Sequence, residues 1–454
     1  MANKELECPC CGGTLHFDSK TQDIVCPYCD SHFSVDDLKA YTDDLASDKE
    51  EDVSWDESTI QNYTNQEMKG MKIYSCESCG GEIIVDETTT STCCPYCGNN
   101  VLVSKQMSGD LKPNLVIPFK NDKETILERL KGFFKKKPLL PSSFSKDNTI
   151  QEIKPLYVPF WLFDADVEGK VRFKGEIYRR WSDAYFDYKE TKYYAIVRGG
   201  NIGFDRVPVD GSLKMQDELM ESIEPYDCSE LVEFNAGYLA GYAADRYDVD
   251  KDVTFNRATE RCRQGTISAL RNDIHGYSNV TYSDSNLQLS NTNAAYALYP
   301  VWILNTKWKD KLFRFAINGQ TGKVAGDLPV SKVKAFLFWM LFFILIGGAC
   351  FGALFAMELG IGAVIAGLIF GAIAATSIVL GMRSKNKNVA FQYGASSYVR
   401  EGSFHVTLRK DIFLYRKVEK TPRPQTPTTS GNKKVIKWSS CSTIFYYFIN
   451  LINR

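Results

Sequence analysis

Hydrophobic residues are spread unevenly along this chain of 454 residues, and their longest uninterrupted run lies in its last third. The 48 residues from Ala335 to Met382 contain a single charged side chain, Glu358, close to their middle. One helix of that length would extend about 70 Å, more than twice the ~30 Å hydrocarbon thickness of a bilayer. The run therefore predicts two membrane-spanning helices, at 335–357 and 359–382.

Charges in and around this run predict its orientation in a membrane. A carboxylate at the bilayer centre would cost about 2.5 kcal/mol or more, so we place Glu358 in a short turn with Gly360 and Gly362, outside the hydrocarbon. Basic side chains flank the run on both sides, namely Lys332 and Lys334 before it and Arg383, Lys385 and Lys387 after it. Because positive flanks stay in the cytoplasm, both termini are expected there, in a cell-membrane protein with two spans.

Small residues within the run could bring the two helices together. Gly348 with Gly352, and Gly367 with Gly371, have the four-residue spacing that lets membrane helices pack closely. The alternative interpretation of the whole run is a buried core hairpin in a soluble protein, which would need a large surrounding shell.

Residues 113–330 show shorter patterns that are typical of a globular α+β domain. Apolar residues at helical spacing predict a helix in "DKETILERLKGFFKK", residues 122–136. Alternating aromatic and β-branched residues predict strands at 155–180 and 192–209. A helical stretch is then expected from about 212 to 272.

An internal similarity organises this domain. "YVPFWLFDADVEGKVRF" and "LYPVWILNTKWKDKLFRF" align at an offset of 141 residues, which places Pro159 on Pro300. We interpret them as two related β-units on either side of a helical insertion. Trp161, Asp164 and Trp302 could line a ligand groove, but we favour aromatic core and strand-edge packing.

The chain beyond the apolar run has two parts. Residues 383–420 predict a cytosolic β-rich segment, either a hairpin or a small sheet. Residues 421–454 predict a disordered tail that begins with a linker rich in proline and threonine. Its last segment, "TIFYYFINLINR", is too short to span a bilayer, although it could rest on a membrane surface.

Composition limits the possible functions. The formal net charge of −1 argues against a globally basic coat for nucleic acid. The length predicts about three structural units, and the start "MANKELECPC" lacks the apolar core of a secretory signal, so we expect the N-terminus to stay inside. Of 14 cysteines, ten lie before residue 98 in CxxC-type clusters, which indicates metal-binding thiolates in a reducing cytosol.

The cysteine clusters form two copies of one motif, 68 residues apart. In each copy, 14 residues separate two CxxC turns, which is enough for a short β-hairpin. Four thiolates complete the tetrahedral coordination of zinc, so we predict zinc ribbons at 1–38 and 73–105, each with one structural Zn²⁺ ion. The predicted ligands are Cys8, Cys11, Cys26 and Cys29 in the first ribbon, and Cys76, Cys79, Cys94 and Cys97 in the second.

Neighbouring residues leave alternatives open at these sites. Cys10 and Cys93 have no equivalent in the other copy, and either could be a spare thiol or replace a ligand. His16 and His32 could join a mixed site, but four cysteines already complete each tetrahedron. A redox role for the CxxC turns would need a thioredoxin-like βαβ context, which the surrounding sequence lacks.

Both predicted ribbons are acidic, which opposes binding to phosphates. The first carries Lys4 and Lys20 against Glu5, Glu7, Asp18, Asp23, Asp30, Asp36 and Asp37, and the second carries Lys105 against Glu77, Glu82, Asp86 and Glu87. We therefore expect protein contact or structural capping rather than binding to nucleic acid. The segment between them, 39–72, is rich in acid and poor in large apolar residues, so it predicts a flexible tether.

The sequence contains no recognisable catalytic motif. Its four histidines, His16, His32, His275 and His405, lie outside metalloprotease, nucleophile-elbow and haem contexts. We therefore predict no catalytic or cofactor-binding residues and expect that the protein is not an enzyme.

Together with the ribbons and the apolar run, "IKPLYVPFWLFDADVEGK" and "AGYLAGYAADRYDVD" resemble the zinc-ribbon membrane proteins of Bacilli. This YdjG-like family is also labelled transcription factor IIB-type zinc-ribbon-containing protein, and the resemblance covers most of residues 1–420. It implies a membrane anchor that brings a cytosolic virion-core or flotillin-domain protein, and phage-shock protein A, to the inner membrane face under envelope stress.

These observations favour a membrane-anchored zinc-ribbon adaptor that docks cytosolic protein partners at the inner face of the cell membrane. A membrane-tethered regulator that binds nucleic acid is one alternative. An enzyme or carrier that uses a groove in the body domain is the other.

Overall fold

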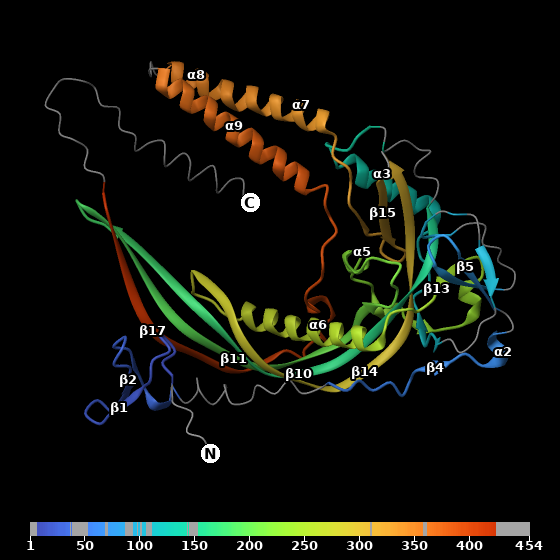
Figure 1. Cartoon of the computed structure of the whole chain (residues 1–454), viewed down its shortest axis with the longest axis horizontal. Coiled ribbons are helices and arrows are strands. Elements are labelled where there is room, and N and C mark those ends of the chain that lie inside the picture. Colours follow the sequence, from blue (N-terminus) through green and yellow to red (C-terminus); the bar gives the residue numbers. More distant parts are fainter. Residues whose placement is uncertain are drawn as a thin grey trace.

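The computed structural model describes residues 7–36, 38, 53–68, 71–86, 94–97, 99, 102–105, 111–142, 144, 153–308, 311–356 and 361–423. Its largest part is a body built around one 12-stranded β-sheet. A pair of apolar helices extends from one end of this body, and a curved part of the sheet extends from a different part of it (Figure 1).

Three long strands form the centre of the sheet. β10 (Lys154–Ser182) pairs antiparallel with β11 (Phe186–Asp210) on one side and with β14 (Asn279–Trp308) on the other. The strands predicted at 155–180 and 192–209 lie within β10 and β11, which confirms both predictions.

The inner half of β10 is buried on both of its faces. Trp161 and Phe163 belong to one core cluster, whereas Phe160 and Leu162 belong to another. This division follows from strand geometry, because successive side chains point to opposite faces of a sheet. The centre of the body is therefore packed with side chains on both sides of the sheet.

Shorter strands complete the main sheet. They are β5 (Met71–Cys76), β6 (Glu82–Asp86), β7 (Leu102–Lys105), β9 (Leu115–Val116), β12 (Val232–Glu233), β13 (Ala243–Asp245), β15 (Lys311–Asn318), β16 (Val324–Gly326) and β17 (His405–Pro422). The sheet therefore extends beyond the domain expected at 113–330, because it includes β5, β6, β7 and β17. The predicted second ribbon thus shares a sheet with the body.

Two helices of the body begin at aspartate caps. In α3 (Lys123–Lys135), the Asp122 side chain accepts a hydrogen bond from the backbone N–H of Thr125, and the buried face matches the predicted helical spacing. In α6 (Lys251–Asn272), Asp250 has the same role. The helix predicted at 122–136 is confirmed.

The helical stretch expected from about 212 to 272 is only partly present. α6 forms its second half, but the first half is divided among short elements. These are α5 (Asp217–Ser222), the 3₁₀ turns η2 (Cys228–Glu230) and η3 (Ala236–Leu239), and the strands β12 and β13. The difference has a tertiary cause, because β13 pairs with both β10 and β6 and is held extended between them.

The outer parts of β10, β11 and β14 join β17 in a long curved sheet, which we call the arm (Figure 1). α6 packs against β10, β11 and β14 on the concave side of this sheet. The segment 383–420 was expected to form its own hairpin or small sheet. Instead, after the 3₁₀ turn η5 (Ser396–Tyr398), it contributes the single strand β17 along β11.

The two similar segments at Pro159 and Pro300 lie in neighbouring strands. β10 and β14 pair with Tyr157 opposite Pro300 and with Trp161 opposite Tyr296. The hairpins β10–β11 and β14–β15 precede and follow α5 and α6 along the chain. Their common origin stays a prediction.

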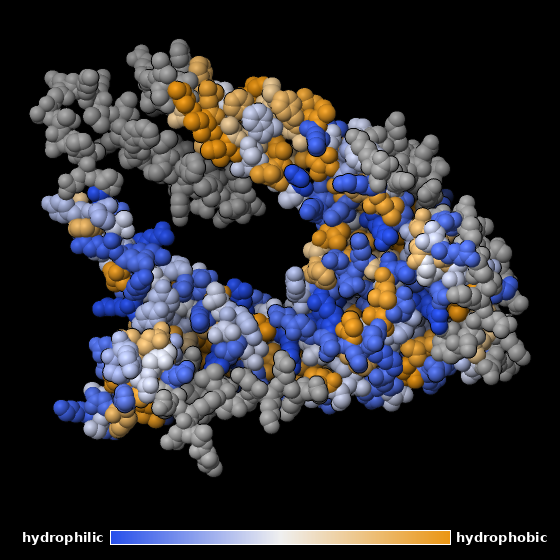
Figure 2. All heavy atoms as spheres, in the orientation of Figure 1, coloured by the Kyte–Doolittle hydropathy of each residue, from blue (hydrophilic) through white to orange (hydrophobic). Residues whose placement is uncertain are grey.

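The apolar run forms two helical stretches that are long and apolar enough to cross a membrane. The first contains α7 (Lys332–Phe342), a π-helical turn η4 (Phe343–Gly347) and α8 (Gly348–Ala356), and the second is α9 (Ile361–Ser384). Figure 2 shows that hydrophobic surface covers these helices. The turn predicted at Glu358 and Gly360 lies outside the described residues, and Gly362 lies within α9.

The two apolar stretches pack against each other through small residues. A Cβ added to Gly371 would lie 2.7 Å from the Cα of Gly347, so the backbones touch here. Trp339 Nε1 donates a hydrogen bond to Thr376 Oγ1 at 3.0 Å. Gly371 was predicted to support such packing, whereas Gly348, also predicted, faces open space.

The predicted tether at 39–72 is partly built into the body. Trp55 is 7% exposed, and its ring centroid lies 4.7 Å from that of Phe163. Tyr63 is also buried. The segment contains the helix α2 (Asn65–Met68) and the strand β4 (Gln61–Asn62), and β4 pairs with β8 (Leu111–Lys112). The tether prediction is therefore wrong for 53–68, because two aromatic side chains anchor this acidic segment, while residues 39–52 lie outside the described part.

Candidate metal centres

The first ribbon is a small three-stranded sheet formed by β1 (His16–Asp18), β2 (Asp23–Val25) and β3 (His32–Phe33). Its first CxxC turn closes when the N–H of Cys8 bonds to the carbonyl of Gly13 at 2.7 Å and the N–H of Gly12 bonds to the carbonyl of Cys8 at 2.8 Å. Gly12 has a φ of 75°, which explains a glycine at this position. The same kind of turn presents Cys26, whose N–H bonds to the carbonyl of Ser31.

The second ribbon repeats this local geometry. The N–H of Cys76 bonds to the carbonyl of Gly81 at 2.9 Å, and the N–H of Gly80 bonds to the carbonyl of Cys76 at 2.7 Å. Gly80 again has positive φ, at 69°. The repeated sequence motif therefore folds into a repeated backbone turn.

The structure brings the eight predicted ligands together as two groups of four. The groups are Cys8, Cys11, Cys26 and Cys29, and Cys76, Cys79, Cys94 and Cys97, and within each group all sulfur atoms lie within 4.8 Å of one another. Four of the sulfur pairs are 3.5, 3.6, 3.6 and 3.7 Å apart. A tetrahedron with Zn–S bonds of about 2.3 Å has edges of about 3.8 Å, whereas a disulfide needs about 2.05 Å.

This geometry fits a metal ion in each group and does not fit disulfides. Four soft thiolates at tetrahedral spacing make zinc a plausible ion. Each group could therefore hold one metal ion.

Local hydrogen bonds favour thiolate at one cysteine of each group. Burial opposes ionisation of Cys76, but hydrogen bonds from the backbone N–H groups of Cys79 and Ser78, together with those to the thiols of Cys97 and Cys79, lower the pKa of this thiol to about 7. In the first group, burial also opposes ionisation of Cys29, but hydrogen bonds that include those with Ser31 lower the pKa of this thiol to about 7, whereas burial raises the pKa of Cys8 to about 11. A metal ion must displace the remaining thiol protons, so metal affinity should rise with pH.

The neighbouring candidates stay outside the two groups. Cys10 is half-buried, and its N–H points to the sulfur of Cys8 at 3.4 Å, but its own thiol is not a member of the first group. His16 and His32 lie on β1 and β3, and neither is a member of a group. Cys93 lies outside the described residues.

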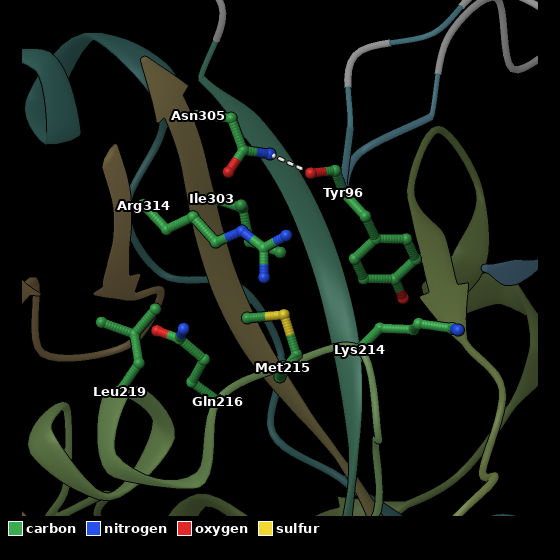
Figure 3. A pocket seen from close by; sticks show the side chains of 8 residues that line it. All are labelled: Tyr96, Lys214, Met215, Gln216, Leu219, Ile303, Asn305 and Arg314. Carbon is green, nitrogen blue, oxygen red and sulfur yellow. Dashed lines mark hydrogen bonds between the residues drawn. The ribbon is translucent and has the colours of Figure 1, made fainter. Parts of the chain in front are cut away.

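Side chains of the body form hydrogen bonds with both CxxC turns of the second ribbon. Lys214 Nζ donates to the carbonyl of Cys79 at 3.2 Å, and Lys154 Nζ donates to the carbonyl of Cys94 at 3.4 Å. Asn305 Nδ2 donates to the carbonyl of Tyr96 at 2.8 Å (Figure 3). These donors bind the main-chain oxygens of Cys79, Cys94 and Tyr96 and so hold the metal centre to the sheet.

Tyr96 inserts its side chain into the body between these donors. Its ring is 4% exposed and borders a small pocket with Met215, Leu219 and Ile303 (Figure 3). Burial, together with the nearby Asp245 carboxylate, raises the pKa of Tyr96 well above its usual value. The phenol therefore stays neutral.

Sequence reasoning missed this attachment, although one signal was present. Ile83, Ile84 and Val85 are three consecutive apolar residues in β6, and all three are buried. Such a run is typical of a strand covered on both faces. The corresponding segment of the first ribbon, "LHF", lacks this pattern.

The first ribbon sits on the arm, far from the second ribbon (Figure 1). Leu414 of β17 packs against its small core of Cys8, Leu15, Cys26, Phe33 and Leu38. Lys410 Nζ also donates to the carbonyl of Asp36 at 3.1 Å. The two candidate metal centres therefore occupy separate regions of the molecule.

The residues considered for a ligand groove lie elsewhere. Trp161 and Trp302 are 0% and 4% exposed, so both belong to the packed core. Asp164 Oδ1 accepts a hydrogen bond from the backbone N–H of Arg206 at 2.7 Å. The structure therefore gives these three side chains packing and structural contacts.

Comparison with known proteins shows that the chain is similar to a bacterial protein. The chain is 32% identical over 328 residues to the uncharacterized protein YdjG of Bacillus subtilis (strain 168). The aligned residues make up 72% of this chain and 91% of YdjG. No family model and no solved structure matches the chain.

Proposed function

The chain belongs to the family of Bacillus subtilis YdjG, and we propose that it is a membrane-anchored zinc-ribbon adaptor. In this proposal α7 to α9 form a two-span hairpin in the cell membrane, and the body and both ribbons face the cytosol. Each ribbon holds one structural Zn²⁺ ion. The protein docks cytosolic protein partners at the inner membrane face.

The observation that carries the proposal is where the apolar helices meet the body. The backbone N–H of Leu328, just before α7, bonds to the carbonyl of Asn386, just after α9, at 3.0 Å. Lys334 Nζ donates to the carbonyl of Leu140 in the body at 2.7 Å. The start of α7 and the end of α9 are thus tied together at one place, which supports a hairpin whose two ends lie on the same side of a membrane.

Basic residues at this junction support a cytosolic location for it. Lys332 and Lys334 precede the first stretch, and Arg383, Lys385 and Lys387 follow the second. The ribbons and the body would then lie in a reducing compartment, where cysteine thiolates stay available for zinc. A reporter fused after residue 454 should be active in the cytosol, and activity only outside the cell would refute this topology.

The adaptor role needs a surface for partners at a distance from the membrane anchor. The first ribbon supports this need, because it lies on the arm rather than in the body core. Its acidic residues oppose binding to nucleic acid. A protein that did bind nucleic acid would show an affinity that falls steeply as the salt concentration rises. The first candidate partners, implied by the family resemblance, are a virion-core or flotillin-domain protein and phage-shock protein A.

A lysine-reactive crosslinker applied to native membranes, followed by mass spectrometry, tests the adaptor role. The wild-type chain should capture specific cytosolic proteins. A matched variant that replaces Cys8 and Cys11 by serine should bind one zinc ion per chain instead of two and should capture less of them. Equal capture by both chains would argue against partner binding through the first ribbon, and no capture by either would refute the adaptor role.

A further inference from the structure

The two ribbons share one structural detail beyond their cysteines. Tyr28 and Tyr96 occupy equivalent positions, 68 residues apart, inside the second CxxC turn of each ribbon. A Cβ added to Gly13 would lie 2.5 Å from the ring of Tyr28, and one added to Gly81 would lie 2.6 Å from the ring of Tyr96. In both ribbons the tyrosine ring therefore covers the glycine of the first turn.

The same positions differ greatly in exposure. Tyr96 is 4% exposed and Val85 is fully buried, because the body covers this face of the second ribbon. Their equivalents in the first ribbon, Tyr28 and Phe17, are 74% and 56% exposed. Val85 and Tyr96 belong to the same core cluster, so we call their equivalents, Phe17 and Tyr28, the aromatic face of the first ribbon. The body covers this pair of positions in the second ribbon, whereas no described residue covers it to a similar extent in the first, so the aromatic face is a candidate interaction surface.

The body shows which chemistry covers such a face. Around Tyr96 it supplies an apolar pocket that includes Met215 and Leu219. Lys214 and Asn305 line the same pocket and donate hydrogen bonds to main-chain carbonyls of the ribbon, and Lys154 donates to a third carbonyl. The internal counterpart of the aromatic face is therefore an apolar pocket with a rim of basic and amide side chains.

The charge of the first ribbon matches a basic rim. Asp18 follows Phe17 directly, and the Asp30 side chain, two residues after Tyr28, is 97% exposed. The acids of its described part are Glu7, Asp18, Asp23, Asp30 and Asp36, against the single cation Lys20. Acidic groups beside the exposed rings would attract lysine and arginine and repel phosphates.

We propose that the aromatic face of the first ribbon is a docking site for a cytosolic protein that presents an apolar pocket rimmed by lysine, arginine or amide side chains. The partner would take Tyr28 into its pocket and bind the second-turn carbonyls, as the body does with Tyr96. This inference rests on the proposed adaptor function, and it specifies which surface docks and what chemistry the partner has.

Site-specific photocrosslinking in the full-length chain, in native membranes, tests the proposal. p-Benzoylphenylalanine placed at position 28 should capture one cytosolic protein, and mapping should locate the crosslink at apolar residues flanked by lysine or arginine. The same label at position 96 is the matched control, and it should crosslink within the chain. Asp18→Lys with Asp30→Lys should reduce capture at position 28 at least tenfold.

Several outcomes would overturn the proposal. They are a crosslink at position 28 to lipid, to nucleic acid or to a second copy of this chain, capture that does not change with the two aspartate substitutions, and no capture at all. Each would mean that the face has another occupant or none.

A second measurement separates this proposal from the adaptor function itself. Tyr28→Ser and Phe17→Ser chains should keep two zinc ions, which shows that the ribbon is folded, and should lose the partner that the lysine-reactive crosslinker captures with the wild-type chain. If the wild-type chain captures a partner and both variants capture it equally, the docking face is wrong and the adaptor function stands. If the wild-type chain captures none, the adaptor function fails as well.

Discussion

Replacing Tyr96 by alanine should detach the second ribbon from the body, whereas the same change at Tyr28 should leave the first ribbon in place. The Tyr96 ring is 4% exposed, and truncating a buried large aromatic side chain costs about 3–5 kcal/mol. Tyr28 is 74% exposed, and substitutions at such positions usually change stability by no more than about 0.5 kcal/mol. The two substitutions have the same chemistry and differ mainly in what covers the ring.

The cost at Tyr96 converts into a measurable population of open molecules. A loss of about 3 kcal/mol corresponds to a roughly hundredfold larger open fraction, since each 1.4 kcal/mol is a factor of ten. The opening should involve β5, β6 and β13, because β6 pairs with both of the others. A chain with several parts does not unfold in one step, so a local probe is needed.

Hydrogen exchange followed by mass spectrometry supplies this probe for the full-length chain in detergent micelles. Peptides that cover β5, β6 and β13 should exchange roughly a hundredfold faster in Tyr96→Ala, while peptides that cover β1 and β2 should keep their wild-type rate in Tyr28→Ala. Zinc content should be measured in parallel, to separate detachment of the ribbon from loss of its metal. Equal effects of the two substitutions on their own ribbons would refute the argument from burial.

Three further predictions concern the body and the apolar helices. Burial raises the pKa of Asp245 to about 7, so the folded state holds this proton more tightly than the unfolded state and loses stability as pH rises from about 4 to about 7. In chemical denaturation, the free energy of unfolding should fall between pH 5 and pH 7 by about 2 kcal/mol less in Asp245→Asn than in the wild-type chain. The same pH dependence in both chains would contradict this prediction. Arg261→Met should lower the free energy of unfolding by about 3–5 kcal/mol in chemical denaturation, because it leaves the buried Glu224 carboxylate without its cation. Adding Glu224→Gln should recover part of this loss. Gly371→Leu should lower the thermal stability of the chain in micelles, whereas Gly348→Leu, which faces open space, should not.

Features that depend on nearby residues could be predicted from the sequence. The spacing of the cysteines brings four sulfurs together because each CxxC turn is a local structure, and the two turns are linked by a short hairpin. The helix α3 could be predicted from its apolar spacing, and the two apolar stretches from their length and composition. In each case, the residues that decide the structure lie within a few tens of positions of one another.

Features that depend on distant partners could not be predicted in this way. Trp55 lies in an acidic segment that is too polar to fold alone, and contacts with distant residues such as Phe163 and Phe255 make its burial favourable. β17 carries a strand pattern, but nothing local shows that Tyr415 pairs with Tyr193 at the edge of the arm. The chain therefore determined by itself the strands β10 and β11, the helix α3, the two apolar stretches and the metal-binding turns, but not the short elements between 212 and 250.

Only the tertiary structure decided that one ribbon is part of the body sheet and the other sits on the arm. The two ribbons have nearly the same local motif, so their own residues prescribe the same turns around the same sulfur geometry. Their different roles arise because β13 and the donors around Tyr96 cover one copy, while no described residue covers Tyr28 to a similar extent in the other. Burial is a property of the neighbours that the fold supplies, and strand pairing across long sequence distances determines those neighbours.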